Sequence, residues 1–284
     1  MCFSRCIGYQ LLKWCFVLKT NLKTSDAKGE IPQGVTIKTE KELAYMWEAG
    51  QVVAKTHLFL RMAIKPGFNT LDLDSSSERE IRSLGAIPAF KGYRGFPGTL
   101  CVSVNDEIVH GIPGKKKIKE GDLVSLDLGA IVAGLYGDAA VTWPVGEIND
   151  NLVKLLEIGE ASLYAGIQKS VSGNRLGDVS SAIQMEIESR SSYGIVREYV
   201  GHGIGRQLHE QPSVPNYGIA GRGVQLRANM AIAIEPMVNL GTHETILLDD
   251  DWTVKTADGK PSVHFEHTVI ITEGTPIITT KLDQ

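Results

Sequence analysis

Two aspartates interrupt an apolar stretch of the sequence at residues 123–143. Asp127 and Asp138 fall in two short predicted strands, on either side of a tight turn expected at Ala133 and Gly134. This turn places the two aspartates roughly opposite each other, where like charges about 5 Å apart destabilise a sheet. Burying both carboxylates is costly, and a bound cation offsets their charge most directly. The alternative is that one aspartate caps a turn while the other is exposed to solvent.

Four further polar residues interrupt apolar or glycine-rich segments. His202 lies between glycines in the segment 201–205, and His209 follows seven residues later. Glu235 and Glu266 each interrupt an otherwise apolar predicted strand. Each residue has an ordinary explanation by itself, as a loop histidine or as a glutamate exposed at a strand end. Together, two Asp, two Glu and at least one His are hard to bury unless they share cations.

A ligand set of this kind is rich in oxygen, includes an imidazole and contains no thiolate. It disfavours soft-metal sites and is compatible with manganese, iron, cobalt or zinc. Bridging carboxylates can hold two divalent ions roughly 3.5–4 Å apart with a hydroxide between them. Such a pair lowers the pKa of water and stabilises a tetrahedral intermediate, so the residues favour a dinuclear metal centre.

The predicted elements that carry these residues follow one order twice. A capping box at 39–42 begins a predicted helix that runs to about residue 63. Thr70 is expected to cap a second helix, which has Asp72 and Asp74 in its first turn and ends at Gly85. Predicted strands follow this second helix. Two further helices are predicted at about 152–168 and 176–190, and the segment at about 229–279 is rich in strands. The order of helix, helix and strands in both halves predicts a pseudo-duplicated α+β domain.

Two features near the first helices have alternative interpretations. The loop at residues 88–98 is rich in glycine, proline and aromatic residues. Its rings are expected either to form the wall or lid of a pocket or to pack in the core. His57 lies on or beside the apolar face of the first helix, and we interpret it as a core or boundary histidine rather than as a metal ligand.

Composition and charge limit the classes of function. The 284-residue chain has an ordinary globular composition and a net charge of −4, which argues against a dedicated nucleic-acid surface. No apolar run approaches the roughly 18 residues of a membrane span. Cys101 is the one cysteine beyond residue 15, and a lone thiol fits a reducing, cytoplasmic compartment. Cys2, Cys6 and Cys15 lack a fourth ligand and a nearby histidine, so a zinc finger is not expected.

Six motifs together resemble those of type I methionine aminopeptidases. They are NDEIVHGIP (105–113), SLDLGA (125–130), GLYGDAAVTW (134–143), YVGHGIGRQLHEQP (199–212), AIEPM (233–237) and FEHTV (265–269). The resemblance covers about 35–280 and keeps five ligand positions in order and spacing. It implies a catalytic domain at 35–284 with the pita-bread fold, a pseudo-symmetric α+β domain with a central antiparallel sheet and outer helices. It also implies removal of the N-terminal methionine from nascent proteins and peptides with a small second residue, by a metal-bridging hydroxide that attacks the scissile carbonyl.

The resemblance implies a role for each residue of the metal site. Asp127 corresponds to the bidentate ligand of one ion, and Asp138 and Glu266 correspond to bridging carboxylates. His202 and Glu235 correspond to ligands of the other ion, and Glu235 also corresponds to the catalytic general base. The implied cofactor is a pair of divalent ions, which can be cobalt, manganese, iron or zinc.

The resemblance also implies the substrate contacts. His110 corresponds to a histidine that contacts the substrate and stabilises the transition state, and His209 to one that hydrogen-bonds the scissile carbonyl. The methionine pocket of the family corresponds to four residues here: Tyr93, Phe96, Cys101 and Trp252. A flexible thioether among aromatic rings is chemically favourable. The implied partners are the N-terminal Met peptides of nascent chains, with transient ribosome contact, and a monomer is expected.

Three residues depart from the family pattern. Leu208 and Phe96 stand where Phe and Tyr are common, and Gly129 stands where Thr is common. The DLGA form of the hairpin is closer to proline-specific relatives, so an Xaa-Pro aminopeptidase or a prolidase is one alternative. The HGIP context of His110 favours methionine specificity instead. A non-catalytic binding module of the same fold is the other alternative, and the retention of all five ligand positions argues against it.

Residues 1–34 are expected to be an extension that is disordered or not natively translated. The first 28 residues contain five basic residues and one acidic residue, and the polar stretch at 20–29 is interpreted as a linker. A removable targeting segment is the alternative explanation.

We predict that deletion of residues 1–30 leaves the melting temperature and kcat nearly unchanged, because the expected ligands and both first helices stay intact. Intact-mass measurement of the natively expressed protein, together with an activity assay of the truncated form, checks this. A full-length native mass combined with a truncated protein that unfolds or loses turnover would show that the segment is structural.

Overall fold

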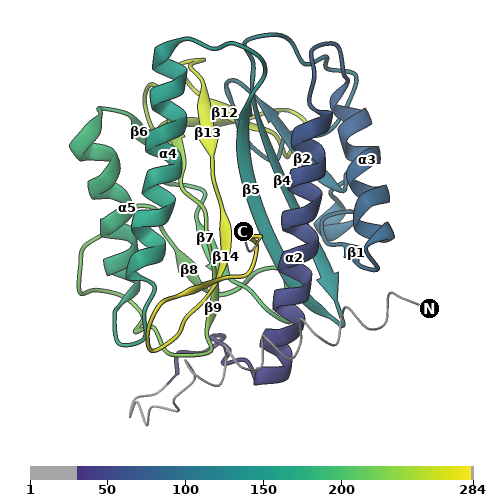
Figure 1. The fold of residues 1–284 in the computed structure, drawn as a ribbon. Coiled ribbons are helices and arrows are strands. Elements are labelled where there is room, and N and C mark those ends of the chain that lie inside the picture. Colours follow the sequence, from purple (N-terminus) through teal and green to yellow (C-terminus); the bar gives the residue numbers. More distant parts are fainter. Residues whose placement is uncertain (1–30, 283–284) are drawn as a thin grey trace.

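The computed structural model of the chain describes residues 31–282, and Figure 1 shows how its elements are arranged. The expectations for residues 1–30 lie outside this described part, so the boundary between extension and domain stays a prediction. The chain is tied to the domain from Val35 onward. Val35 forms a β-bridge with Gln211, and the Lys38 amide donates to the carbonyl of Asn229.

The elements occur in the predicted order, with two helices followed by strands in each half. The first half contains α2 (Glu40–Ala63), α3 (Thr70–Ser83), β1 (Ile87–Pro88), the short 3-10 helix η1 (Tyr93–Gly95), β2 (Leu100–Val104), β3 (Glu107–Val109), β4 (Leu123–Val132) and β5 (Leu135–Pro144). The second half begins with α4 (Asp150–Lys169) and α5 (Leu176–Arg190). Its strands are β6 (Gly194–Ile195), β7 (Gly201–Gly203), β8 (Glu210–Val214), β9 (Ala231–Ile234), β10 (Met237–Asn239), β11 (Thr245–Leu247), β12 (Val254–Thr256), β13 (Ser262–His264), β14 (His267–Ile270) and β15 (Ile277–Ile278).

Side-chain caps set the starts of the first helices. Thr39 and Glu42 form the predicted capping box of α2: the Glu42 amide donates to Thr39 Oγ1 at 3.3 Å, and the Thr39 amide donates to Glu42 Oε2 at 2.9 Å. The prediction that Thr70 caps α3 is wrong. Asn69 has extended backbone dihedrals and is the N-cap, whereas Thr70 is already helical and its hydroxyl donates to a backbone carbonyl of another loop.

Asp74 also differs from its prediction, which placed it in the first turn of α3. Only Asp72 is acidic within that turn. Asp74 is buried, and its Oδ1 accepts the amides of Thr99 at 2.7 Å and Leu100 at 2.9 Å. The carboxylate therefore fixes the start of β2, the strand that carries Cys101.

The β4–β5 hairpin is formed as predicted, with a correction to its register. The turn at residues 133–134 has positive φ at both positions, 49° and 80°, as in the two-residue turns that suit the twist of a hairpin. The expectation that the aspartates lie opposite each other is wrong, because this turn pairs Asp127 with Ala140 and Asp138 with Gly129. The two aspartates are diagonal neighbours on one face, since side chains two residues apart point the same way.

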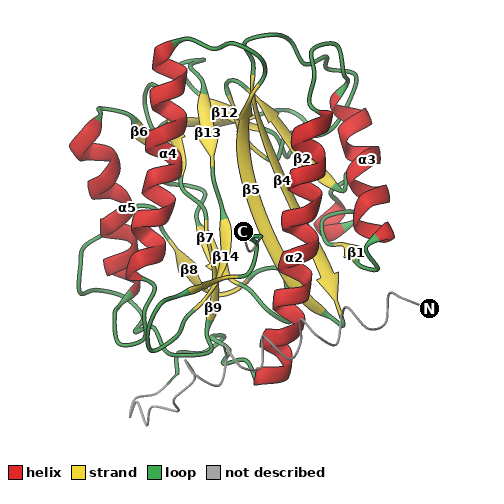
Figure 2. Cartoon of the chain, viewed as in Figure 1, coloured by secondary structure: helices red, strands yellow, loops and turns green. Residues whose placement is uncertain are grey.

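The strands form antiparallel sheets with the helices outside them (Figure 2). In the first half, β4 pairs with β1, β2 and β5; in the second half, the largest sheet has the order β15-β14-β9-β7-β8. Each half has its own core: Val53 of α2 and Leu73 of α3 cluster with Leu126 of β4, and Leu155 of α4 clusters with Ile232 of β9. This layout confirms the α+β prediction.

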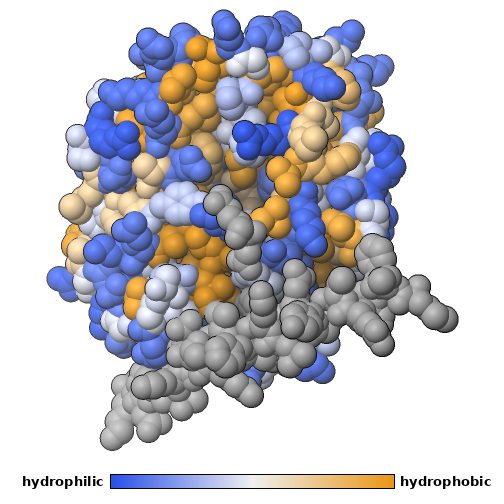
Figure 3. Space-filling model, in the orientation of Figure 1, coloured by the Kyte–Doolittle hydropathy of each residue, from blue (hydrophilic) through white to orange (hydrophobic). Residues whose placement is uncertain are grey.

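The face that carries the helices is of mixed polarity. Figure 3 shows hydrophilic side chains spread over this face, with hydrophobic residues visible between them. None of the helices within residues 31–282 is long and apolar enough to cross a membrane.

Candidate metal centre

Five chain segments meet at one pocket, and each brings one of the predicted metal ligands. Asp127 lies in β4, Asp138 in β5 and His202 in β7. Glu235 directly follows β9, and Glu266 directly precedes β14. All five side chains line a cavity of about 290 Å³. The structure therefore brings together residues from both halves of the chain.

His202 is oriented toward the carboxylates by its own backbone. Its Nδ1 lies 2.9 Å from the carbonyl oxygen of Gly203, so this nitrogen carries the proton. The unprotonated Nε2 faces Glu235 Oε1 at 3.5 Å and Asp138 Oδ2 at 4.0 Å. Burial lowers the pKa of His202 to about 4, which keeps the ring neutral. A neutral imidazole with its lone pair among carboxylate oxygens is what a metal ion requires.

Asp138, His202 and Glu266 form the tightest group in the pocket. One ligand atom of each lies within 4.8 Å of the others, and all three residues are buried. Hydrogen bonds hold the two acidic segments side by side. The Glu266 amide donates to Ala140 O at 2.8 Å, and Thr268 Oγ1 donates to Asp138 O at 2.8 Å while it accepts the Asp138 amide at 3.0 Å. The hairpin of the first half is thus joined to β14 at the site.

Burial shifts the pKa of all four carboxyl groups upward. It raises the pKa of Asp127 to about 7. For Asp138, Glu235 and Glu266, burial and then repulsion from neighbouring carboxylates raise the pKa well above the usual range. Three carboxylate oxygens have no hydrogen-bond partner: Asp127 Oδ1, Asp138 Oδ1 and Glu266 Oε1.

These unpartnered oxygens fit divalent cations. Within residues 31–282, the ion-pair partners of the four carboxylates are His202 and His264, whose pKa values of about 4 and about 3 make both rings neutral at pH 7. No basic side chain therefore balances the buried negative charge. A divalent ion supplies that charge, and a set of carboxylates with an imidazole suits manganese, iron, cobalt or zinc.

Two other buried histidines have different surroundings. His57 is a core histidine, as predicted: it lies on α2 with Nε2 2.9 Å from Ala139 O. His264 was not predicted as a site residue. It is 2% exposed, and its unpartnered Nε2 lies 3.9 Å from Glu235 Oε2. The signal that could have found it is its position two residues before Glu266, since alternate residues of an extended segment share a face.

His209 lies beside His202 at the mouth of the pocket. The centroids of the two rings are 4.1 Å apart. Tyr93 stacks on His209 at 5.4 Å, and its hydroxyl lies 2.9 Å from His209 Nδ1. Burial, and then the proximity of His202, Arg94 and His110, lower the pKa of His209 to about 3. The ring is therefore neutral at pH 7, with its Nε2 available to a substrate.

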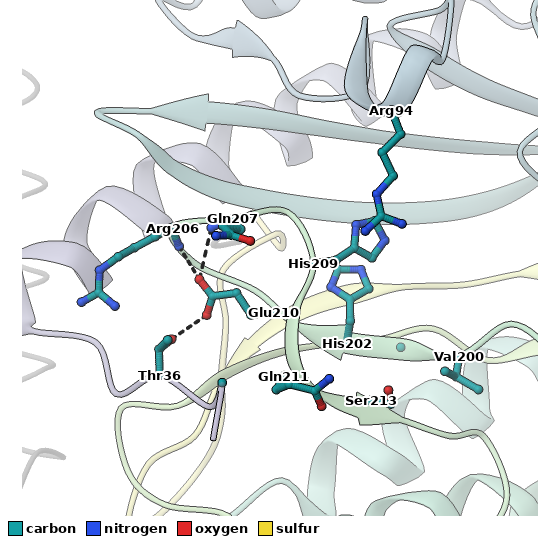
Figure 4. Close-up of a pocket in the computed structure, with 12 residues that line it drawn as sticks. Thr36, Arg94, Val200, His202, Arg206, Gln207, His209, Glu210, Gln211 and Ser213 are labelled. Carbon is teal, nitrogen blue, oxygen red and sulfur yellow. Dashed lines mark hydrogen bonds between the residues drawn. The ribbon is translucent and has the colours of Figure 1, made fainter. Parts of the chain in front are cut away.

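Glu210 fixes the loop that carries His209. Its Oε1 accepts two amides of that loop at 2.7 and 3.1 Å, and its Oε2 accepts the hydroxyl of Thr36 (Figure 4). Lys38 Nζ donates to the same Oε2 at 3.1 Å. The side chains of Lys38 and Glu210 are 1% and 6% exposed, so they form a buried ion pair. The segment just before α2 therefore anchors His209.

The aromatic loop at residues 88–98 forms a wall of the pocket, as one of its two interpretations predicted. Phe90, Tyr93 and Phe96 line the cavity. Gly129 stands where threonine is common in the family, and the reason for this difference is steric. A β-carbon at this position would lie 2.9 Å from both the Phe90 ring and the Ala89 side chain. Gly129 therefore makes room for the ring of Phe90.

The remaining predicted residues complete an apolar lining. Phe96 meets Trp252 edge to face with centroids 5.1 Å apart, and His110 meets Trp252 at 6.3 Å. Cys101 pairs directly with Asp127 across β2 and β4, and burial raises the pKa of its thiol well above the usual range. The thiol is thus neutral. Lining residues to which the sequence analysis gave no role are Arg94, Val109, Glu198, Tyr199 and Val200.

Comparison with known proteins shows the family. Residues 44–273 match the model of metallopeptidase family M24. This chain belongs to metallopeptidase family M24. Over 239 residues it is 52% identical to methionine aminopeptidase 1 of Bacillus subtilis, a match that covers 84% of this chain and 96% of that protein. With the buried Asp, Glu and His group, membership of this family means that the protein uses divalent metal.

Solved structures in family M24 agree with this assignment. A crystal structure of methionine aminopeptidase from Thermotoga maritima has 46% identity and a TM-score of 0.85, and the match covers 87% of this chain and 100% of that chain. The prolidase from Pyrococcus furiosus has 24% identity and a TM-score of 0.71, and the match covers 87% of this chain and 66% of that chain. This likeness shows the shared fold alone. The resemblance to type I methionine aminopeptidases and the expected pita-bread fold are thereby confirmed.

We predict that Asp138→Asn and Glu266→Gln each lower the number of bound metal ions and remove most activity, because a neutral amide binds a cation more weakly than an ionised carboxylate does. Elemental mass spectrometry of dialysed protein gives the stoichiometry. Asp106→Asn is a matched control, since Asp106 pairs with Lys255 and not with the site, and it should keep the wild-type metal content. A site variant that retains wild-type kcat with two bound ions would contradict the assignment.

We also predict that metal-free protein loses stability as the pH rises from about 7 to about 8.5. In this window the carboxyl groups whose pKa is raised furthest, Asp138, Glu235 and Glu266, retain protons in the folded state that the unfolded chain has released, whereas Asp127, with its pKa of about 7, has largely lost its own. Folding becomes less favourable as the pH rises, because the folded state binds more protons than the unfolded chain. The buried histidines have lowered pKa values, so they make stability rise with pH. This opposite effect is confined to pH values below their unfolded pKa of about 6.5.

Thermal melts with EDTA and with Mn²⁺ check this pH dependence. Mn²⁺ should abolish the decrease, because cations stabilise the ionised carboxylates. A melting temperature of the metal-free protein that stays constant or rises across the window would be inconsistent with four buried carboxyl groups of raised pKa.

Proposed function

We propose that this protein is a methionine aminopeptidase that removes the N-terminal methionine from nascent proteins and peptides with a small second residue. The observation that carries the proposal is the convergence of five ligand positions, two histidines and a ring-lined cavity in one site. A metal-dependent peptidase needs cations beside a space for the scissile carbonyl. A methionine side chain needs an apolar lining that adapts to a flexible thioether.

Five ligand residues would hold two divalent ions. Asp127 would hold one ion, His202 and Glu235 would hold the other, and Asp138 and Glu266 would be shared by both. Four ionised carboxylates carry four negative charges, which two divalent ions balance. When bound, the ions lower the pKa of water and polarise the peptide carbonyl. The ligand set is compatible with cobalt, manganese, iron or zinc.

Glu235 acts as the general base. Its carboxylate lies between two neutral imidazoles, with His202 Nε2 3.5 Å from one oxygen and His264 Nε2 3.9 Å from the other. In the metal-free site, burial and the charge of Asp127 raise its pKa. With cations bound the carboxylate would be ionised, which is the form that accepts a proton. It takes the proton of the attacking water and passes it to the leaving amine.

His209 and His110 hold the scissile carbonyl and stabilise its developing charge. The hydroxyl of Tyr93 lies 2.9 Å from His209 Nδ1. In the tautomer in which this hydroxyl donates, the ring proton is on His209 Nε2 and faces the carbonyl oxygen. His110 is buried in the same cavity, where burial lowers its pKa and keeps it neutral. Both rings therefore act as hydrogen-bonding groups rather than as fixed charges.

The methionine side chain occupies the apolar part of the cavity. Phe96, Cys101 and Trp252 surround the thioether, and Tyr93 forms the wall near His209. The stacked rings of Tyr93 and His209 restrict the space beyond the scissile bond, so glycine, alanine, serine or threonine fits as the second residue. Larger second residues are excluded.

The proposed setting is the cytoplasm, where the enzyme acts as a monomer on nascent chains with transient ribosome contact. Cys101 is the one cysteine within residues 31–282, and it is a buried free thiol. A free thiol fits a reducing compartment.

An Xaa-Pro aminopeptidase or a prolidase is the second candidate function. The DLGA sequence at 127–130 and the fold shared with a prolidase favour it. The ratio of kcat/KM for Met-Ala-Ser to that for an Xaa-Pro dipeptide separates the two functions. Methionine aminopeptidase activity requires a strong preference for Met-Ala-Ser and poor cleavage of a Met-Leu peptide.

We predict that His110→Ala and His209→Ala bind metal almost normally yet lose on the order of 10²-fold or more in kcat/KM for Met-Ala-Ser, as for lost transition-state hydrogen bonds. Metal analysis and steady-state kinetics on the same preparations measure both properties. His243→Ala is a control at a histidine that lines a different cavity, and it should keep the wild-type kinetics. Loss of a metal ion in either site variant would show that its role has been misassigned.

A further inference from the structure

A second cavity adjoins the metal site. Its volume is about 690 Å³, and it shares Arg94, Val200, His202 and His209 with the pocket that holds the ligands. Its other walls come from the segment before α2, from the loop at 205–211 and from β8. A peptide whose first residue occupies the metal pocket therefore has this cavity as the continuation of its path beyond His209.

Most charged groups beside this cavity are already paired. The Glu210 carboxylate is used by two amides, a hydroxyl and Lys38. The guanidinium of Arg206 bonds the Glu42 carboxylate at 2.6 and 2.8 Å. Figure 4 shows the side chain of Arg206 pointing away from His209. Neither Glu210 nor Arg206 offers a free charge to a ligand in this cavity.

Arg94 is the exception. It is exposed, and within residues 31–282 no carboxylate forms an ion pair with it. Its guanidinium lies 5.4 Å from the centre of the Tyr93 ring, and Figure 4 shows it directed toward His209. Arg94 and His209 line the same two cavities, and the positive charge of Arg94 contributes to the lowered pKa of His209. The boundary between the two cavities thus carries the positive charge of Arg94. The exposed Glu198, whose carboxylate accepts the Arg197 amide, also lines the metal pocket.

The backbone holds Arg94 in this position. It lies within the 3-10 helix η1 with φ 48° and ψ 24°, in the left-handed region that non-glycine residues rarely adopt. Gly92 and Gly95 on either side also have positive φ, 84° and 92°. This tight loop projects the side chain over Tyr93 instead of along the protein surface.

We propose that the larger cavity binds the peptide residues that follow the scissile bond and that Arg94 selects an acidic side chain at the third residue of the substrate. This inference rests on the proposed function. An extended chain advances about 3.3 Å per residue, so when the scissile carbonyl is at His209 the third residue lies beyond this ring, beside Arg94. An arginine pairs with a carboxylate through two parallel hydrogen bonds.

The test uses three peptides that differ only at the third residue: Met-Ala-Asp-Gly-Gly, Met-Ala-Asn-Gly-Gly and Met-Ala-Lys-Gly-Gly. Their C-termini are amidated, so that no terminal carboxylate competes for Arg94. We expect kcat/KM of the wild-type enzyme for the Asp peptide to exceed that for the Asn peptide by roughly two- to five-fold, as for an exposed ion pair. The Lys peptide should have the lowest kcat/KM of the three. The differences in kcat/KM among the peptides should become smaller as the salt concentration is raised.

Variants assign the preference to one residue. Arg94→Gln should cleave the Asp and Asn peptides equally well, and Arg94→Lys should retain part of the preference. Arg206→Gln is the matched control and should keep the wild-type ratio. Equal kcat/KM for Asp and Asn in the wild type, or a preference that persists in Arg94→Gln, would overturn the inference. Failure of the wild type to cleave even the Asn peptide would overturn the proposed function instead.

Discussion

The burial of four carboxylates in one cavity is the constraint on which the rest of the structure depends. An isolated ionised carboxylate is too costly to keep in a low-dielectric interior, and four together repel one another. Without cations, these groups hold protons, which is the physical meaning of their raised pKa values. Divalent ions replace those protons, so metal binding and ionisation are one coupled process. Neutral His202 fits this scheme because it adds a lone pair without adding a charge.

The scaffold meets this constraint with backbone hydrogen bonds rather than with charged side chains. Asp138 and Glu266 are held by hydrogen bonds between the β4–β5 hairpin and the segment around β14. Among these are the two bonds of Thr268 Oγ1, which accepts the Asp138 amide and donates to the Asp138 carbonyl. These contacts fix the acidic segments without offering a cation to their side chains. A lysine or arginine in the same place would neutralise the carboxylates and compete with the metal. The site thus lies where the two halves meet, because each half supplies acidic ligands and neither forms the site alone.

Sequence reasoning could find the ligands, because a charged residue in an apolar strand is conspicuous without a structure. It could also find the order of the helices and strands, since caps and periodicity are local signals. The register of the hairpin was wrong although the turn was right, because Asp127 and Asp138 are not equidistant from residues 133–134. Asp74 was misplaced because its partners are the amides of Thr99 and Leu100, more than twenty positions along the chain. Contacts at such separations leave no periodic signal.

The rim of the site depends on contacts of this long-range kind. Lys38 and Glu210 are 172 positions apart, and their ion pair is buried and supported by further hydrogen bonds. An ion pair so well enclosed is costly to break, because removal of one partner leaves the other charged and desolvated. The loop that carries His209 is therefore held in one position. The same pairing removes Glu210 as a competitor for Arg94, whose positive charge lies at the edge of a negative centre. A substrate with a neutral thioether first and a carboxylate later along its chain matches that distribution of charge.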